Sequence, residues 1–328
     1  MTPSDYESGD TPGTVAAPWT FVIVADMQPG SPRSFRYNPS WQKNWEQARA
    51  QVLALDPELM LVPGDLTRDG SIHRFELEAM KEDLDALPFP VHVIPGNMDT
   101  GNKHTDRPGV HRGPARGPNQ SSDVELNVTS EELQQFASVF GPLWWSVDHK
   151  GVRFSGCADM AINSGLPEER AFWRWAETQV QRPQADHHVW ITHYPLFVQD
   201  PDEPDWDIET DYRSWYFSID QPGRRRLLNL FHATGVDLVV SGHVHCHKVF
   251  EAEGIRFEIA PATSFGQWGA HWPDGDDTLG FLRCDVDADG ITTTVIPLET
   301  TYDLEGYGPG GHPAPHTRDY SLAWETEA

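Results

Sequence analysis

The segment Thr20–Gln28 reads TFVIVADMQ, a short apolar run that stops at an acidic residue followed closely by an amide. Similar runs, rich in β-branched residues and ending near Gly, Asp, Asn or His, recur along the chain. They are Thr20–Ala25, Leu59–Val62, Val91–Ile94, Val189–Thr192 and Val236–Val240. Continuous apolar runs of about four to eight residues are typical of strands that are buried on both faces. The pattern therefore predicts several central strands.

Helical segments lie between these runs. Asn38-Pro39 has the pattern of an N-cap followed by a first-turn proline, and it predicts a helix over Trp41–Leu55. Thr129 and Glu132 have the spacing of a capping box. Further helices are predicted over Ser71–Leu87, Pro167–Val180 and Gln221–Thr234. Strands that alternate with helices indicate an α/β fold with mostly parallel strand order.

Two regions depart from this alternation. Over Trp145–Cys157 and Lys248–Pro297, strand-like runs follow one another through short glycine turns. This mixture predicts two packed sheets flanked by helices. We expect one domain over residues 18–300, a flexible N-terminal tail over residues 1–17 and a C-terminal tail over residues 301–328. The long loops 101–123 and 198–218 are candidates for a functional role.

Composition excludes several classes of partner. The chain has 328 residues, and its 50 acidic against 24 basic side chains give a net charge of −26. Such a charge repels phosphate backbones and anionic lipids, so we expect no nucleic acid and no membrane partner. Three cysteines in so long a chain indicate a reducing compartment, and Met1–Pro18 lacks the features of a signal peptide. The expected location is the cytoplasm, and the oligomeric state is left open.

Polar residues follow the apolar runs at the point where each run ends. In open α/β sheets ligands gather beyond the carboxyl ends of the strands, so these side chains are expected to converge. Carboxylate, amide and imidazole groups without sulfur suit Mn, Fe or Zn. There are enough of them for two ions, and a shared carboxylate between two ions suits in-line displacement at a phosphoester. The candidate metal ligands are Asp26, Gln28, Asp65, Asn97, His193, His243 and His245.

The order D-x-Q, G-D, G-N-x-D, H, G-H-x-H, spread over Asp26–His245, resembles the calcineurin-like metallophosphoesterases. Within them it is most similar to the branch of calcineurin-like phosphoesterase domain-containing proteins. The resemblance implies a four-layer α/β/β/α sandwich of the metallo-dependent phosphatase type with two divalent or trivalent metal ions. It also implies a phosphatase-like hydrolase in which a metal-bound hydroxide attacks phosphorus in line, on a phosphorylated small molecule or protein. One ion would be held by Asp26, Gln28, Asp65 and His245, and the other by Asp65, Asn97, His193 and His243.

The chain departs from the family pattern at Met98, where the family has a histidine that is thought to protonate the leaving alcohol. Methionine has no proton to donate. The family's next acid orients that histidine, and here it is Asp99. Asp99 and Asn97 are therefore candidate catalytic residues, together with His104 as the nearest substitute acid. Met98 and Arg68 are candidates for contact with the substrate.

Several interpretations stay open at this point. The substrate could have a good leaving group, or the acid could come from elsewhere in the chain. A phosphodiesterase or pyrophosphohydrolase acting on a small metabolite is the first alternative. A dimetal enzyme with non-hydrolytic or redox chemistry is the second, and a binding module without turnover is the third.

Overall fold

The computed structural model describes residues 18–31, 37–103, 127–198, 200–204, 217–266 and 274–302. The first of its two sheets has the strand order β11-β10-β1-β2-β3. Strands β1, β2 and β3 are parallel, whereas β10 and β11 are joined antiparallel at the other edge. The strands are β1 (Trp19–Ile23), β2 (Met60–Pro63), β3 (Val91–Ile94), β10 (Gly280–Asp287) and β11 (Gly290–Pro297).

The second sheet has the strand order β4-β5-β6-β7-β9-β8. The central strands β5, β6, β7 and β9 run parallel, and an antiparallel strand closes each edge. The strands are β4 (Trp144–His149), β5 (Val152–Cys157), β6 (His187–Thr192), β7 (Leu238–Ser241), β8 (Lys248–Ala252) and β9 (Ile255–Ile259).

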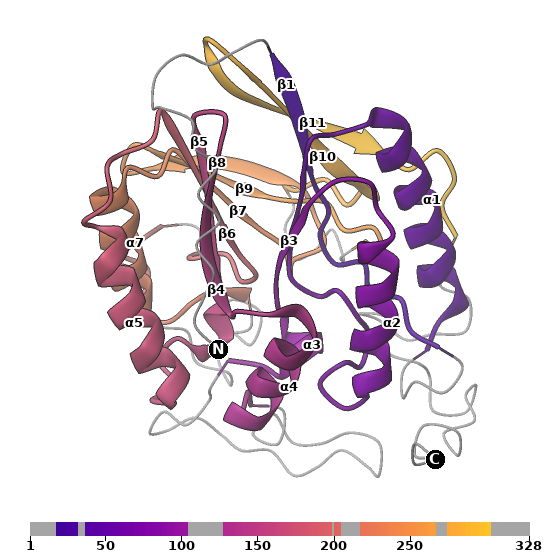
Figure 1. The fold of residues 1–328 in the computed structure, drawn as a ribbon, viewed down its shortest axis with the longest axis horizontal. Helices are drawn as coiled ribbons and strands as arrows, with labels where there is room; N and C mark the ends of the chain where they lie inside the picture. Colours follow the sequence, from indigo (N-terminus) through magenta and orange to yellow (C-terminus); the bar gives the residue numbers. More distant parts are fainter. Residues whose placement is uncertain are drawn as a thin grey trace.

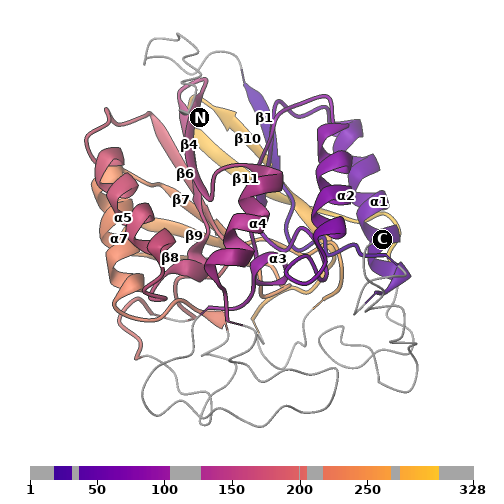
Figure 2. The same ribbon diagram turned by 60° about the horizontal axis from the view of Figure 1, so that its bottom comes forward.

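The helices cover the outer faces of the two sheets (Figure 1). Helices α1 (Pro39–Leu55) and α2 (Arg74–Asp85) lie on the side of the first sheet, and α5 (Pro167–Gln179) and α7 (Gly223–Thr234) lie on the side of the second. Figure 2 shows the same separation after rotation. This arrangement confirms the expected α/β/β/α sandwich. Three short or peripheral helices complete the description: α3 (Asn97–Thr100), α4 (Ser130–Phe140) and the 3₁₀ turn η1 (Asp159–Ala161).

Strand β1 shows why the central strands read as continuous apolar runs. Phe21 and Ile23 belong to the core between the sheets, which also contains Phe154 and Ile191. Their neighbour Val22 belongs instead to the core beneath the helices. All of these side chains are fully buried. Both faces of the strand are covered, so no polar alternation survives in the sequence.

Both predicted helix caps are present. Asn38 Oδ1 accepts a hydrogen bond from Ser40 N at 2.9 Å, at the start of α1. Thr129 Oγ1 accepts from Glu132 N, and the Glu132 carboxylate accepts from Thr129 N, as a capping box requires. None of the helices in the described part of the chain combines the length and the apolar character that a membrane span needs.

Candidate metal centre

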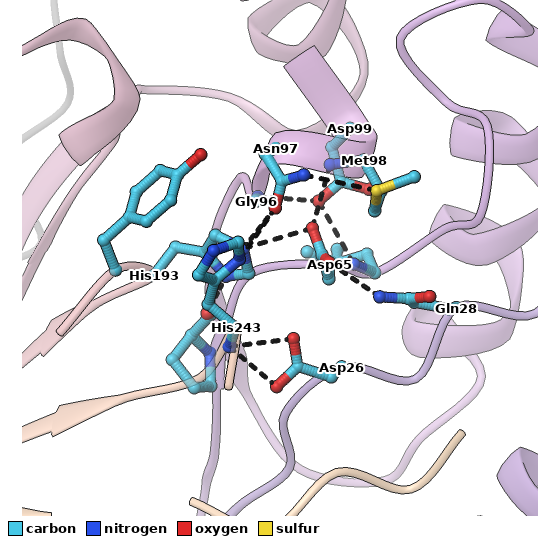
Figure 3. Close-up of polar contacts among 12 residues, drawn as sticks. Asp26, Gln28, Asp65, Gly96, Asn97, Met98, Asp99, His193 and His243 are labelled. Atoms are coloured by element: carbon cyan, nitrogen blue, oxygen red, sulfur yellow. Dashed lines mark hydrogen bonds and ion pairs between the residues drawn. The ribbon is translucent and has the colours of Figure 1, made fainter. Parts of the chain in front are cut away.

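The predicted ligands meet beyond the carboxyl ends of five strands. Asp26, Asp65 and Asn97 follow β1, β2 and β3 of the first sheet, and Figure 3 shows them beside His193 and His243. His193 follows β6 of the second sheet, and His243 and His245 follow β7. The carboxylates and imidazoles form two groups, and within each group the potential ligand atoms lie within 4.8 Å of one another. One group is Asp65, His193 and His243, and the other is Asp26, Asp65 and His245. Asp65 belongs to both.

The backbone at these positions is strained. Asp26, Gln28, Asp65, His243 and His245 all have φ between 46° and 69°, in the left-handed region. Side chains with a Cβ rarely adopt this region, and each such residue costs about 1 kcal/mol or more. Strain of this kind persists where the surrounding structure determines it and is frequent at functional sites.

Two glycines let the loops approach one another. Gly64 has a φ of +89°, and a Cβ there would lie 2.5 Å from His193 Nδ1. A Cβ at Gly96 would lie 2.2 Å from Asp65 Oδ1. The chain therefore turns sharply at Gly64, immediately before Asp65. At Gly96 the missing side chain is needed chiefly because the two loops touch.

His193 has its lone pair turned towards other electron-rich atoms. Its Nδ1 lies 2.9 Å from the Pro63 carbonyl oxygen, so Nδ1 carries the proton and donates it. The unprotonated Nε2 then faces Asn97 Oδ1 at 2.9 Å and Asp65 Oδ1 at 3.3 Å. Burial lowers the pKa of His193, which disfavours a second proton. Three electron-rich atoms that face one another in this way fit a metal cation.

Asn97 presents its oxygen to this group because Asn102 holds the other end of the amide. Asn97 Nδ2 donates to Asn102 Oδ1 at 2.9 Å, and Asn97 Oδ1 lies 3.0 Å from His243 Nδ1. Asn102 was not among the functional residues predicted from the sequence. The sequence gives little indication of its role, because it is a single polar residue in the loop that follows the G-N-x-D motif.

The group around Asp26 has the same character. His245 Nδ1 donates to the Phe265 carbonyl oxygen at 2.8 Å, which leaves Nε2 as a lone pair 3.5 Å from Asp26 Oδ1. Burial lowers the pKa of His245 to about 3. Burial and repulsion from Asp65 raise the pKa of Asp26 well above its ordinary value. Buried carboxylates that repel each other fit a cation between them.

Gln28 and Arg68 are neighbours at the edge of this group. Gln28 Nε2 donates to Asp65 Oδ2 at 2.7 Å, while its Oε1 accepts from Arg68 Nη1 at 2.7 Å. The Arg68 guanidinium is buried, with its centre 4.7 Å from the centroid of the Trp41 ring. Metal ligation by Gln28 and substrate contact by Arg68 stay predictions.

The loop that carries Met98 and Asp99 is tied down by the carboxylate of Asp99. This carboxylate accepts hydrogen bonds from the backbone N–H groups of Leu66, Thr67 and Gly96. Burial and repulsion from Asp65 raise the pKa of Asp99 to about 6. Asp99 thus holds two ligand loops together.

Met98 lies directly beside the predicted ligands, and it is 7% exposed. Its N–H donates to Asp65 Oδ1 at 2.9 Å, and its Sδ lies 3.3 Å from Asn97 Nδ2. Asn97 was predicted both as a catalytic residue and as a metal ligand. Its side-chain oxygen lies among the potential ligand atoms. His104 lies outside the described residues.

Asp159 is a second supporting residue that was not predicted from the sequence. Its two carboxylate oxygens accept from His193 N at 2.7 Å and Tyr194 N at 2.8 Å, and it is 1% exposed. It follows β5, so the rule that located the other residues at strand ends also applies to it. Burial raises its pKa to about 6. The Tyr194 ring in turn lies 4.3 Å from the His243 ring.

Comparison with known proteins finds one matching family and related phosphatases. The family model described as calcineurin-like phosphoesterase matches residues 20–247. The serine/threonine-protein phosphatase CPPED1 of Danio rerio is 24% identical over 292 residues, which cover 81% of this chain and 80% of that protein. CPPED1 of Homo sapiens is also 24% identical, over 237 residues that cover 62% of this chain and 71% of that protein.

Solved structures share the fold. A purple acid phosphatase, PPD1, from yellow lupin superimposes with a TM-score of 0.54 and 14% identity, covering 89% of this chain and 54% of that one. A dimetal phosphatase from Danio rerio gives a TM-score of 0.52 and 12% identity, covering 87% of this chain and 99% of that one. The sandwich is thus that of the metallo-dependent phosphatases.

Proposed function

The chain belongs to the calcineurin-like phosphoesterase family and is a metal-dependent phosphoesterase, and on that premise we propose that it hydrolyses phosphate monoesters at a two-metal centre built around Asp65. One observation carries the proposal. Two groups of buried ligand atoms share the Asp65 carboxylate, and each group pairs it with at least one imidazole. A carboxylate shared in this way can hold two ions close enough together to act on one phosphate.

The donor set fits two ions of Mn, Fe or Zn. Asp26, Asp65 and His245 would hold one ion, with the fourth predicted ligand, Gln28, hydrogen-bonded to Asp65 beside them. Asp65, Asn97, His193 and His243 would hold the other. Such a pair of ions supplies an activated water for attack at phosphorus and neutralises the charge on the phosphate oxygens. The remaining contributions come from the chain itself.

The chain prepares the ligands through contacts to its own backbone. His193 and His245 each donate from Nδ1 to a backbone carbonyl oxygen, which orients the ring and keeps Nε2 unprotonated. Asp159 fixes the backbone of His193. Asn97 adds an oxygen ligand without adding charge, so the site carries less negative charge than three carboxylates would give it.

Met98 limits the leaving groups that we propose for the substrate. A thioether beside Asn97 provides no proton for a departing alcohol. We therefore propose substrates whose leaving groups depart without one, namely aryl, enol or anhydride phosphates, unless His104 supplies the proton. The same observation favours a second candidate function, hydrolysis of phosphodiesters or pyrophosphates of small metabolites with such leaving groups.

A protein substrate also belongs to the proposal, because the curated relatives of Danio rerio and Homo sapiens are named serine/threonine-protein phosphatases. A phosphoserine has an alkyl leaving group, which needs the proton that Met98 does not provide. Phosphopeptides are thus the most informative substrates to compare with aryl esters.

The test is a panel of substrates with the Mn²⁺-loaded protein. It compares p-nitrophenyl phosphate, bis-p-nitrophenyl phosphate, glycerol phosphate, a nucleoside diphosphate and a phosphoserine peptide, with Asp65→Asn as the control. We expect turnover of the aryl monoester that stops with a chelator and is absent in Asp65→Asn. Turnover of the diester or diphosphate alone would favour the second candidate. A protein that binds Mn²⁺ but cleaves none of the panel would contradict both.

A further inference from the structure

We infer that Gln28 is a hydrogen-bond donor locked in place by Arg68, and that this lock weakens metal binding at the group formed by Asp26, Asp65 and His245. The inference rests on the proposed function, because it presumes a metal centre. It concerns which of the two ligand groups binds its ion more tightly, and which residue outside the ligand set decides this.

The orientation of the Gln28 amide follows from the chemistry of Arg68. A guanidinium has only N–H donors, so the amide atom that lies 2.7 Å from Arg68 Nη1 must be the oxygen. The NH₂ group therefore points the other way, into the ligand group. The nitrogen and oxygen of an amide are assigned from such partners.

The atoms on the inner side of the amide agree with this orientation. Asp65 Oδ2 lies 2.7 Å from Gln28 Nε2, and His245 Nε2 lies 3.3 Å from it. The carboxylate is an acceptor, and His245 Nε2 is a lone pair because Nδ1 holds the proton that is donated to Phe265. The Gln28 NH₂ group thus faces two acceptors, and its oxygen faces a donor. A rotated amide would place NH₂ against the guanidinium and its oxygen against a carboxylate and a lone pair.

Arg68 is held firmly enough to impose this orientation. Its side chain is 2% exposed and lies over the Trp41 ring, and its backbone N–H lies 3.1 Å from Glu76 Oε2. Trp41 packs on Phe265, with ring centroids 5.2 Å apart, and Phe265 provides the carbonyl that orients His245. Arg68 and His245 are therefore fixed by one packed unit.

The consequence is an asymmetric centre. Gln28 NH₂ hydrogen-bonds to Asp65 and His245. A cation can be coordinated by these acceptor atoms only if the hydrogen bonds to Gln28 break. At the other group Asn97 presents an oxygen instead. We therefore expect Mn²⁺ to bind in two distinct steps, with the weaker step at Asp26, Asp65 and His245.

Isothermal titration of the metal-free protein with MnCl₂ tests this inference. The variants are Gln28→Met, which keeps the side-chain length but lacks the NH₂, and Arg68→Met, which removes the lock. His245→Ala is the control that removes a ligand. We expect the weaker step to tighten about tenfold in both methionine variants, the effect of about one hydrogen bond, and to be lost in the control. Circular dichroism confirms folding, and Gln28→Met suffices if Arg68→Met does not fold.

The outcomes separate the inference from the proposed function. If Gln28→Met weakens the second step as His245→Ala does, Gln28 is a ligand and the inference is wrong. Two equal affinities in the wild-type protein would also overturn it, while leaving the two-metal centre intact. A wild-type protein that binds no Mn²⁺ would overturn the proposed function, and the inference with it.

Discussion

At position 98 a thioether lies where the chemistry of an alkyl ester calls for an acid. Met98→His would place a group with an ordinary pKa of about 6.5 beside Asn97. General acid catalysis is worth about 10²-fold or more for poor leaving groups and little for good ones. We expect kcat for glycerol phosphate to rise about 100-fold, with a small change for p-nitrophenyl phosphate. The measurement is the ratio of the two kcat values.

Met98→Gln is the matched control for this prediction, because it has a similar size and no acid. The ratio should stay at the wild-type value in that variant. An equal rise in both variants would mean that Met98 acts through its shape. No change in Met98→His would mean that leaving-group protonation does not limit the reaction.

Asn102 acts at the same scale, on the orientation of a single amide. Asn102→Ala removes the acceptor of Asn97 Nδ2, so the Asn97 oxygen is no longer held towards His193 and His243. We expect the tighter Mn²⁺ step to weaken about 10- to 100-fold, the usual effect of losing a residue that orients a ligand. Equilibrium dialysis with metal analysis measures it. Asn102→Asp keeps the acceptor, and equal weakening in both variants would contradict this explanation.

At the scale of elements, His188 connects its strand β6 to helix α7 and to strand β5. Its Nδ1 donates to the Thr234 carbonyl oxygen at the end of α7, and its Nε2 lies 2.9 Å from Ser155 Oγ of β5. Burial lowers the pKa of His188 to about 4. The unfolded chain, with a pKa of about 6.5, therefore takes up the proton first. His188 leaves stability unchanged above pH 6.5 and reduces it as the pH falls towards 4, by on the order of 3 kcal/mol in total.

The variant His188→Gln removes this titration and keeps an amide donor. We expect its free energy of unfolding, measured in urea at pH 7, 6 and 5, to fall less steeply than that of the wild-type protein. A chelator in both samples removes the separate effect of metal release at low pH. Parallel curves for the two proteins would show that His188 does not titrate in this range.

Elements also show what the sequence could and could not predict. Strands β1, β2, β6 and β7 were predictable because both of their faces are buried. Strand β3 was predicted from the same kind of run, although only Ile94 of its four residues is fully buried. The polar residues at the strand ends followed from the same rule. The insertion of β9 between β7 and β8 depends on pairing between distant segments, which no local pattern encodes. The predicted helix over Ser71–Leu87 begins instead at Arg74, since Ile72 N and His73 N both bond back to Asp69 O in a turn.

The residues that support the site were harder to predict than the ligands. Asn102 has no sequence pattern to mark it. Asp159 follows β5 as the ligands follow their strands, but its role depends on contacts to the backbone N–H groups of His193 and Tyr194. Arg68 was visible as a charged residue near the second motif, but its burial against Trp41 and Gln28 depends on packing between α1 and two loops.

At the scale of the whole molecule the two sheets contribute different chemistry. Asp26, Asp65 and Asn97 follow strands of the first sheet, and His193, His243 and His245 follow strands of the second. A metal ion at either group would therefore connect the two halves of the sandwich. The cation would also offset the repulsion from Asp65, which adds to burial in raising the pKa of Asp26.

Metal binding should for this reason stabilise the whole fold. At a Mn²⁺ concentration about 100 times the dissociation constant, one site adds about 2.7 kcal/mol, which raises Tm by several degrees in a domain of this size. Scanning calorimetry with Mn²⁺ and with a chelator measures the difference. Asp65→Asn, which weakens both groups at once, should abolish most of the shift, whereas His188→Gln should keep it. A shift that persists in Asp65→Asn would mean that Mn²⁺ stabilises the protein from somewhere other than the junction of the two sheets.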